Sequence, residues 1–316
     1  MGELDKLGSE FRISINPDES GFVGRECPNV SCHKYFKIRP GTGLTGPNLP
    51  CICPYCGHEG GAQTFFTPEQ IEYAKSVVMN KVTNAILADM KNMEFERDLG
   101  LGLKLSMKVE GQPHPINRYR EIDLETQVTC DKCTLQYFIY GVFSFCPDCG
   151  SHNSLQILLK NLELVQKGME LSEKADPDLR ERLLSDALNG SVSAFDGFGR
   201  EVLHVNQSKT KNTKIREKKI SFQNILKAQD QVRELFGFDF LSILSENELT
   251  FLKRCFQKRH LFIHKMGVVD QEYLNLTNDS KEVVGRKVSL VKSEIASLTD
   301  ILRRIGHKLV SDISKS

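Results

Sequence analysis

The stretch Cys130–Gly150 reads CDKCTLQYFIYGVFSFCPDCG, and it decides much of the fold of this chain. Two pairs of cysteines, each separated by two residues, flank a segment rich in strand-forming aromatic residues. Each pair, placed on a tight turn, can direct both thiolates to one side of a tetrahedron, and a hairpin between the pairs closes the site. Pro147 provides one fixed φ and Gly150 one positive φ, which suit such a turn. The stretch therefore predicts a zinc ribbon.

The same pattern occurs once more, nearer the N-terminus. Cys27 and Cys32 precede a Cys-Pro-Tyr-Cys-Gly turn at 53–57, so eight of the ten cysteines fall into two sets of four. A site closed by four cysteines leaves no open position for catalysis, so we predict two structural Zn²⁺ ions. The predicted metal ligands are Cys27, Cys32, Cys53, Cys56, Cys130, Cys133, Cys146 and Cys149.

Disulfides are the alternative use of these cysteines. The polar, acidic start of the chain contains no secretory signal and no apolar run approaches eighteen residues, so we expect a cytoplasmic protein without a membrane segment, in which thiols stay reduced. Cys51 is an alternative ligand to Cys53, and His33 and His58 are spare donors. Cys255 falls on the apolar stripe of a predicted helix, where a small core residue is expected.

That helix is predicted to run for roughly twenty residues before Gly267, which suits a C-terminal cap. Ser245 and Glu248 form a capping box at its start. Its segment 259–264 reads RHLFIH. In an ideal helix the two histidines share a face, whereas the arginine and the second histidine diverge by about 140°.

Arg259, His260 and His264 resemble the motif of the HEPN superfamily, helical domains whose ribonuclease members carry Arg, a polar residue, a few further residues and then His. The resemblance covers roughly residues 176–313, and it implies a homodimer in which two copies of this helix form a shared cleft. It further implies metal-independent endoribonuclease activity on RNA. His264 would move protons, Arg259 would hold the scissile phosphate, and His260 would orient His264 or share the proton transfer. A toxin or antiviral defence role is the expectation that follows.

Other interpretations of this helix stay open. His260, His264, Gly267 and Asp270 reproduce the spacing of one branch of zinc peptidases, but Leu261 stands where those enzymes carry the general base Glu. The two histidines could also be structural residues on a half-buried helix face. In that case the chain would be a non-catalytic module in which ribbons and helices bind RNA or protein.

Basic residues indicate where RNA would bind. The net charge of +1 excludes a broadly basic coat, so any contact must be local. One run lies between two predicted helices, with a solvated loop as the alternative, and consists of Lys209, Lys211, Lys214, Arg216, Lys218 and Lys219. Lys34, Lys37 and Arg39, interleaved with aromatic residues, could contact nucleic acid or simply fill the first hairpin. No phosphate-binding Gly-rich loop is present, which argues against a nucleotide hydrolase.

The predicted fold class is therefore an α+β multidomain chain, with two small β zinc ribbons followed by an all-α, HEPN-like bundle. Its segments are zinc ribbon 1 at 1–62, a helix and strand connector at 63–110, zinc ribbon 2 at 111–153, a linking helix at 154–175 and the helical domain at 176–316. In the connector, a capping box at 67–70 opens a helix whose buried face we expect to contain Ile71, Ala74, Val78, Val82 and Ala85, and alternation at 101–107 predicts a strand.

Overall fold

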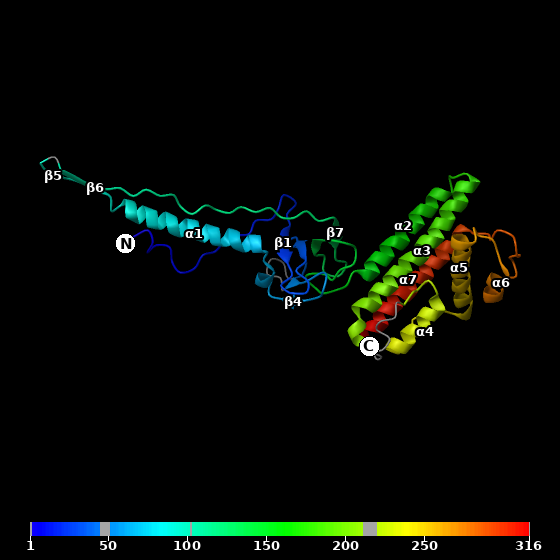
Figure 1. Ribbon diagram of the computed structural model, residues 1–316. Helices are drawn as coiled ribbons and strands as arrows, with labels where there is room; N and C mark the ends of the chain where they lie inside the picture. The colour runs from blue at the N-terminus through cyan, green and yellow to red at the C-terminus, as the bar shows by residue number, and fades with distance from the viewer. Residues whose placement is uncertain (1, 45–50, 102, 211–219, 316) are drawn as a thin grey trace. The chain divides into compact units, whose positions relative to one another are not determined.

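One antiparallel sheet contains strands from both cysteine-rich segments (Figure 1). Its order is β1-β2-β8-β7, and its strands are β1 (Val23–Glu26), β2 (Tyr35–Ile38), β7 (Thr126–Thr129) and β8 (Gln136–Ile139). The central pairing places Lys37 opposite Phe138 and Ile38 opposite Tyr137. The two ribbons, which the sequence analysis assigned to separate segments, therefore share one sheet.

The computed structural model describes residues 2–44, 51–101, 103–210 and 220–315. The chain divides into an N-terminal unit, Met1–Ser151, and a helical unit, His152–Ser316. The two-residue strands β3 (Cys51–Ile52) and β4 (Glu59–Gly60) complete the first ribbon, and a 3-10 turn, η2 (Ala62–Phe65), leads from it into a long helix. Among the described helices, none has both the length and the apolar character required to cross a membrane.

The long helix of the N-terminal unit is α1 (Pro68–Lys91). It begins at the predicted capping box, in which the Thr67 hydroxyl accepts from the Gln70 backbone and the Gln70 side chain accepts from the Thr67 backbone. The expected buried face is wrong except at Ala85, because Ile71 is 43% exposed and the apolar positions between them are only half-buried. Polar contacts with the segment 114–117 cover a different face of α1.

A two-stranded hairpin follows α1, formed by β5 (Phe95–Gly100) and β6 (Leu103–Met107). Alternation of apolar residues predicted the second strand, whereas the first strand was not predicted from the sequence. Phe95 pairs with Met107 and Arg97 with Leu105, so these three apolar side chains lie on one face of the hairpin, together with Arg97. This face is exposed in the N-terminal unit.

Six described α-helices form the helical unit. They are α2 (Ser154–Ser172), α3 (Pro177–Val205), α4 (Ile225–Phe236), α5 (Glu246–His264), α6 (Gln271–Thr277) and α7 (Lys292–Lys315), with a 3-10 turn η3 (Gln207–Lys209) after α3. The long helices α2, α3 and α7 pack against one another, and α5 packs on α3 and α7 (Figure 1). The helix that the sequence analysis treated as a link is therefore part of the bundle, where its Leu158 and Leu162 are fully buried.

The helix ends follow local signals in the sequence. Asp176 caps α3 through two backbone N–H groups and precedes Pro177 at the first helical position. The Ser245 capping box opens α5, and the Gly267 backbone, with φ of 79°, donates to the Leu261 carbonyl after its end. The helix α4 begins at Ile225, after Asn224, whose side chain accepts from the Lys227 backbone.

Candidate functional site: two cysteine centres and the His260–His264 pair

Four cysteines from two loops form the first candidate metal centre. Cys27 and Cys32 lie between β1 and β2, and Cys53 and Cys56 lie between β3 and β4. The Sγ atoms of Cys27 and Cys56 are 3.6 Å apart, and those of Cys32 and Cys53 are 3.8 Å apart. A tetrahedron with Zn–S bonds of 2.3 Å requires sulfur atoms about 3.8 Å apart. The four thiols therefore fit one zinc-sized ion.

The second centre repeats this geometry in the other ribbon. The Sγ atoms of Cys130 and Cys149 are 3.7 Å apart, and those of Cys133 and Cys146 are 3.4 Å apart. After the second cysteine of each turn, a backbone N–H donates to the carbonyl of the first, as in Gly150 to Cys146 at 3.0 Å. All eight predicted ligands are thus brought together in two groups of four that could hold metal ions.

The thiols of each centre perturb one another's ionisation. Burial raises the pKa of Cys53, and hydrogen bonding with Cys130 together with burial raises that of Cys146. The same hydrogen bond with Cys146 lowers the pKa of Cys130. Neighbouring sulfur atoms this close oppose simultaneous ionisation, and a divalent cation removes the opposition because it stabilises every thiolate. The chemistry of the donor set therefore fits a metal.

The alternative donors stay outside both groups. Cys51 is buried on β3, where burial raises its pKa to about 12, and its thiol is not part of the first centre. Neither His33 nor His58 joins a described group of three or more metal ligands. The structure thus favours Cys53 over Cys51 as a ligand. Cys255 is buried in the core of the helical unit, as expected.

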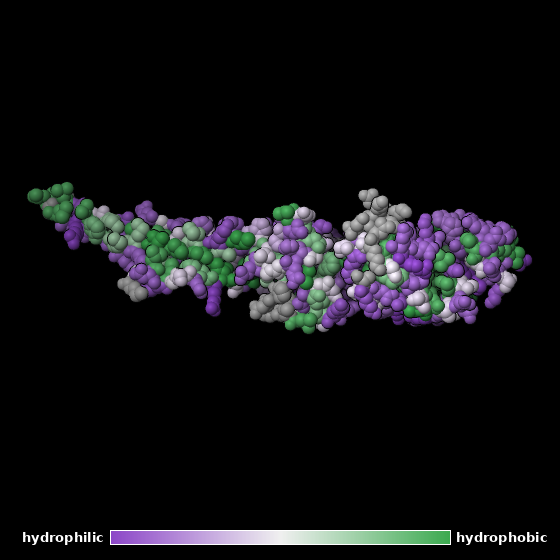
Figure 2. All heavy atoms as spheres, turned by 90° about the horizontal axis from the view of Figure 1, so that it is seen from below, coloured by the Kyte–Doolittle hydropathy of each residue, from purple (hydrophilic) through white to green (hydrophobic). Residues whose placement is uncertain are grey.

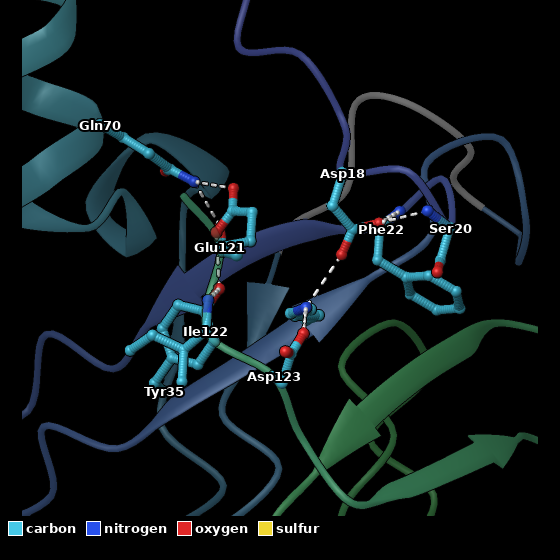
Figure 3. Close-up of polar contacts among 10 residues, drawn as sticks. Asp18, Ser20, Phe22, Tyr35, Gln70, Glu121, Ile122 and Asp123 are labelled. Carbon is cyan, nitrogen blue, oxygen red and sulfur yellow. Dashed lines mark hydrogen bonds and ion pairs between the residues drawn. The ribbon is translucent and has the colours of Figure 1, made fainter. Parts of the chain in front are cut away.

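One basic residue beside the first ribbon, Lys37, is buried and used internally, and Figure 3 shows its carboxylate partners Asp18 and Asp123. Lys37, only 5% exposed, donates to Asp18 at 2.9 Å and lies 3.7 Å from Asp123. Burial acts to raise the pKa of Asp18, but the hydrogen bonds from Lys37 and the Phe22 backbone outweigh it and the pKa is lowered. Of the two readings, the structure supports hairpin filling for Lys37 rather than contact with nucleic acid.

The neighbouring contacts in Figure 3 anchor α1 to the sheet. The Tyr35 hydroxyl donates to Glu121 at 2.5 Å, and the Gln70 amide donates to the same carboxylate at 3.0 Å. Burial and the Glu121 carboxylate raise the pKa of Tyr35. Gln70 therefore links the first turn of α1 to the segment that leads into β7. This hydrogen-bond network could not be predicted from the sequence, because its members are far apart along the chain.

In the helical unit, Arg259 and the two histidines have different environments. Arg259 is 9% exposed, and its buried Nε donates no hydrogen bond within the described residues. Burial lowers its pKa, and the charge of Asp196 on α3 acts in the opposite direction. His260 and His264 are exposed, with ring centroids 4.7 Å apart. The helix thus directs the arginine inward and the imidazole pair outward.

The peptidase spacing does not assemble a metal site in this structure. Within the described residues, the two cysteine centres are the only groups of three or more metal-ligating side chains. Asp270 instead caps α6, accepting from the Tyr273 backbone at 2.7 Å, and pairs with Lys265. Leu261 is buried where the general base would stand.

Most of the predicted RNA-binding run lies outside the described residues, namely Lys211, Lys214, Arg216, Lys218 and Lys219. Lys209 is described and donates to the Ile313 carbonyl in the last turn of α7 at 2.9 Å. A cation at this position stabilises the negative end of the helix dipole. This contact gives Lys209 a structural partner.

Comparison of the chain with protein-family models, with curated proteins and with solved structures finds no match. The proposals below therefore rest on this chain's own residues and on the motif resemblance stated above.

Proposed function

We propose that the helical unit is a metal-independent endoribonuclease of the HEPN type, in which His260 and His264 transfer protons. The exposed imidazole pair on one face of α5 is the observation that carries this proposal. An imidazole can act as general base or as general acid, so one of two neighbouring rings can accept a proton while the other donates one. Exposure also weighs against a purely structural role, because neither ring fills a core.

In this proposal Arg259 is a positioning residue in the single chain. Its guanidinium faces the interior beside α3, so it supports the packing of α5 that presents the histidines. A phosphate then needs another cation. Lys253 is seven residues before His260, on nearly the same helix face, and no ion pair links it to another described residue. We assign phosphate binding to Lys253.

The remaining parts of the proposal follow from the cysteine centres and from the resemblance. We take the two metals to be structural zinc ions that stabilise the N-terminal unit, which would recognise RNA or a partner. Reduced thiolates favour a cytoplasmic location. A homodimer through the helical unit and a toxin or antiviral defence role belong to the same proposal and are supported by the resemblance alone.

The test is cleavage of one single-stranded and one structured RNA, followed on gels in the presence of EDTA for a period too short to strip the cysteine centres. His264→Ala and His260→Ala should each lower the cleavage rate about 10²- to 10⁴-fold, the usual loss for an acid–base group. His307→Ala is the matched control, because His307 is an exposed histidine on α7. It should cleave as the wild type does.

Two outcomes would overturn parts of this proposal. If the wild type cleaves neither RNA, or if His264→Ala cleaves as fast as the wild type, the chain is the non-catalytic binding module instead. Arg259→Ala should lower the melting temperature together with activity, whereas Lys253→Ala should lower activity alone. Loss of activity in Arg259→Ala with an unchanged melting temperature would make Arg259 a direct phosphate ligand.

A further inference from the structure

An apolar surface of unusual extent runs along α1 and the β5–β6 hairpin. Eleven large hydrophobic side chains between Ile71 and Met107 are exposed in the described structure, and Leu101 at the hairpin end is fully exposed. In Figure 2 apolar residues gather along α1 and at the hairpin. The eleven are Ile71, Met79, Ile86, Met90, Met93, Phe95, Leu99, Leu101, Leu103, Leu105 and Met107.

Part of this surface is hollowed. A shallow pocket of about 440 Å³ lies between α1 and the N-terminal segment, and its walls are almost wholly apolar. Ile13 and Ile15 form one side, and Ile71, Val78 and Met79 form the other. A flat apolar face could be incidental, but a hollow of this kind offers room for apolar side chains from another molecule.

The hairpin itself needs a partner. An isolated two-stranded hairpin is at best marginally stable in water, and both of its strands are edges. Phe95, Leu103 and Leu105 lie on one face, while Glu96 and Lys104 form an ion pair on the other. Burial of the apolar face would supply the stability that the hairpin lacks. A partner that is always available to the folded chain would meet this need.

The size of the surface matches a stable interface. The exposed fractions of the eleven side chains correspond to on the order of 1,000 Å² of apolar surface, which exceeds the largest patch of an ordinary monomer. A standard interface buries about 800 Å² on each partner. The face is thus large enough to support a permanent association.

The charges around this face indicate what covers it. Between Ile71 and Met107 the chain carries five acidic and five basic residues. Anionic lipid or nucleic acid would attract a surface with an excess of cations, and this one has none. An apolar surface with equal numbers of acidic and basic residues can pack against a second copy of itself across a two-fold axis. A second copy is also always available in equal amount, as the hairpin requires.

We propose that α1 and the β5–β6 hairpin form a self-association surface, on which a second copy of this chain buries the exposed apolar face. This association is separate from the dimer implied for the helical unit, and it does not depend on the proposed nuclease activity. The hairpins of both copies gain a packed apolar face from it. The association of the N-terminal units would hold two helical units on one assembly.

Sedimentation velocity of the full chain over a broad range of concentration tests the proposal. The wild type should associate, and replacing Leu103 and Leu105 together by Thr should weaken one association step at least about 100-fold, because each copy loses two buried leucines. Threonine keeps the strand preference of the hairpin. Zinc content and far-UV circular dichroism should stay unchanged, which separates lost association from lost folding.

The matched control replaces Lys104 and Ser106 by Thr, on the opposite face of β6, and should associate as the wild type does. Ile86→Gln is a second probe, placed on α1, and it should weaken the same association step. Its control is Lys81→Gln, which should not. A dimer through the helical unit would be a separate step that none of these variants changes.

Three results would overturn the proposal. The first is a wild type that stays monomeric at the highest concentration, and the second is equal association of the apolar-face variants and the control variants. The third is co-sedimentation of the wild type, but not of the Leu103 and Leu105 variant, with vesicles of neutral or anionic phospholipid, which would assign the face to a lipid surface.

Discussion

One backbone feature recurs at all four cysteine turns. The residue after the second cysteine has a positive φ in each, with 70° at Gly57, 67° at Gly150, 46° at His33 and 65° at Thr134. Glycine adopts this conformation freely, whereas a residue with a Cβ atom is strained there by roughly 1–2 kcal/mol. The turn geometry is therefore imposed even where the sequence does not favour it, as expected of a site organised around a metal.

Cysteine substitutions should distinguish Cys51 from Cys53, two of the buried thiols of the first ribbon. Cys53→Ser should lose one zinc ion per chain, because its Sγ lies 3.8 Å from that of Cys32 within the centre. Cys51→Ser should keep both ions and destabilise the unit by about 1–3 kcal/mol, since a hydroxyl replaces a buried thiol. Metal analysis of protein prepared reduced and without chelator decides the question. The opposite pattern would reassign the ligand, and metal-free wild-type protein would remove the zinc assignment.

At the scale of elements, a glycine on α3 lies where the segment before α4 packs closely against this helix. Gly199 on α3 faces Phe222, which lies just before α4, and a Cβ atom at this glycine would be 2.5 Å from the buried phenylalanine ring. Gly197 is on the same helix and would have no neighbour within 4 Å. Nothing in the helical periodicity distinguishes the two glycines. The difference arises only because the chain returns to α3 after residue 219.

This pair gives a direct test of the packing. Gly199→Ala should lower the free energy of unfolding by about 1–3 kcal/mol, because the added methyl group overpacks the core. Gly197→Ala should raise it by about 0.5–1 kcal/mol, because alanine favours the helix. Thermal or urea unfolding followed at 222 nm measures both. Similar stabilities for the two variants would show that α3 and Phe222 do not pack as described.

At the scale of the whole molecule, the two units are stabilised in different ways. Six of the thirteen buried residues in the core of the sheet are cysteines, and five of those belong to the candidate metal centres. Among the described residues, the main hydrophobic cluster of the helical unit contains twenty-six buried residues, of which Cys255 is the only cysteine. Small ribbons bury too little apolar surface to fold on that alone. Among the described residues, thiols that could hold metal therefore make up much of the core of the sheet, whereas the core of the helical unit consists mainly of apolar side chains.

Prolonged chelation should consequently unfold the N-terminal unit and leave the helical unit folded. The chain contains no tryptophan, and six of its seven tyrosines precede residue 152, so near-UV circular dichroism reports mainly on the N-terminal unit. Chelation should remove this signal while most of the helical signal at 222 nm persists. Added Zn²⁺ should restore it. An unchanged near-UV spectrum after complete metal removal would contradict a structural role for the metal.

Local patterns in the sequence determined much of this protein. Cysteine spacing predicted both four-thiol groups, and capping residues predicted where α1 and α5 begin. Both kinds of signal act over a few residues, through turn geometry and through hydrogen bonds to the first turn of a helix. The angle by which Arg259 and His264 diverge around the helix axis is also a local property, because helix geometry alone sets it.

Only the tertiary structure decided which surfaces meet. The pairing of β2 with β8, the burial of Lys37 and the inward position of Arg259 depend on segments distant in the chain. The apolar face of α1 shows most clearly what the sequence could not determine. Periodicity predicted a helix with such a face, but it did not predict what covers that face. Burial is a property of two surfaces in contact, and periodicity describes only one of them.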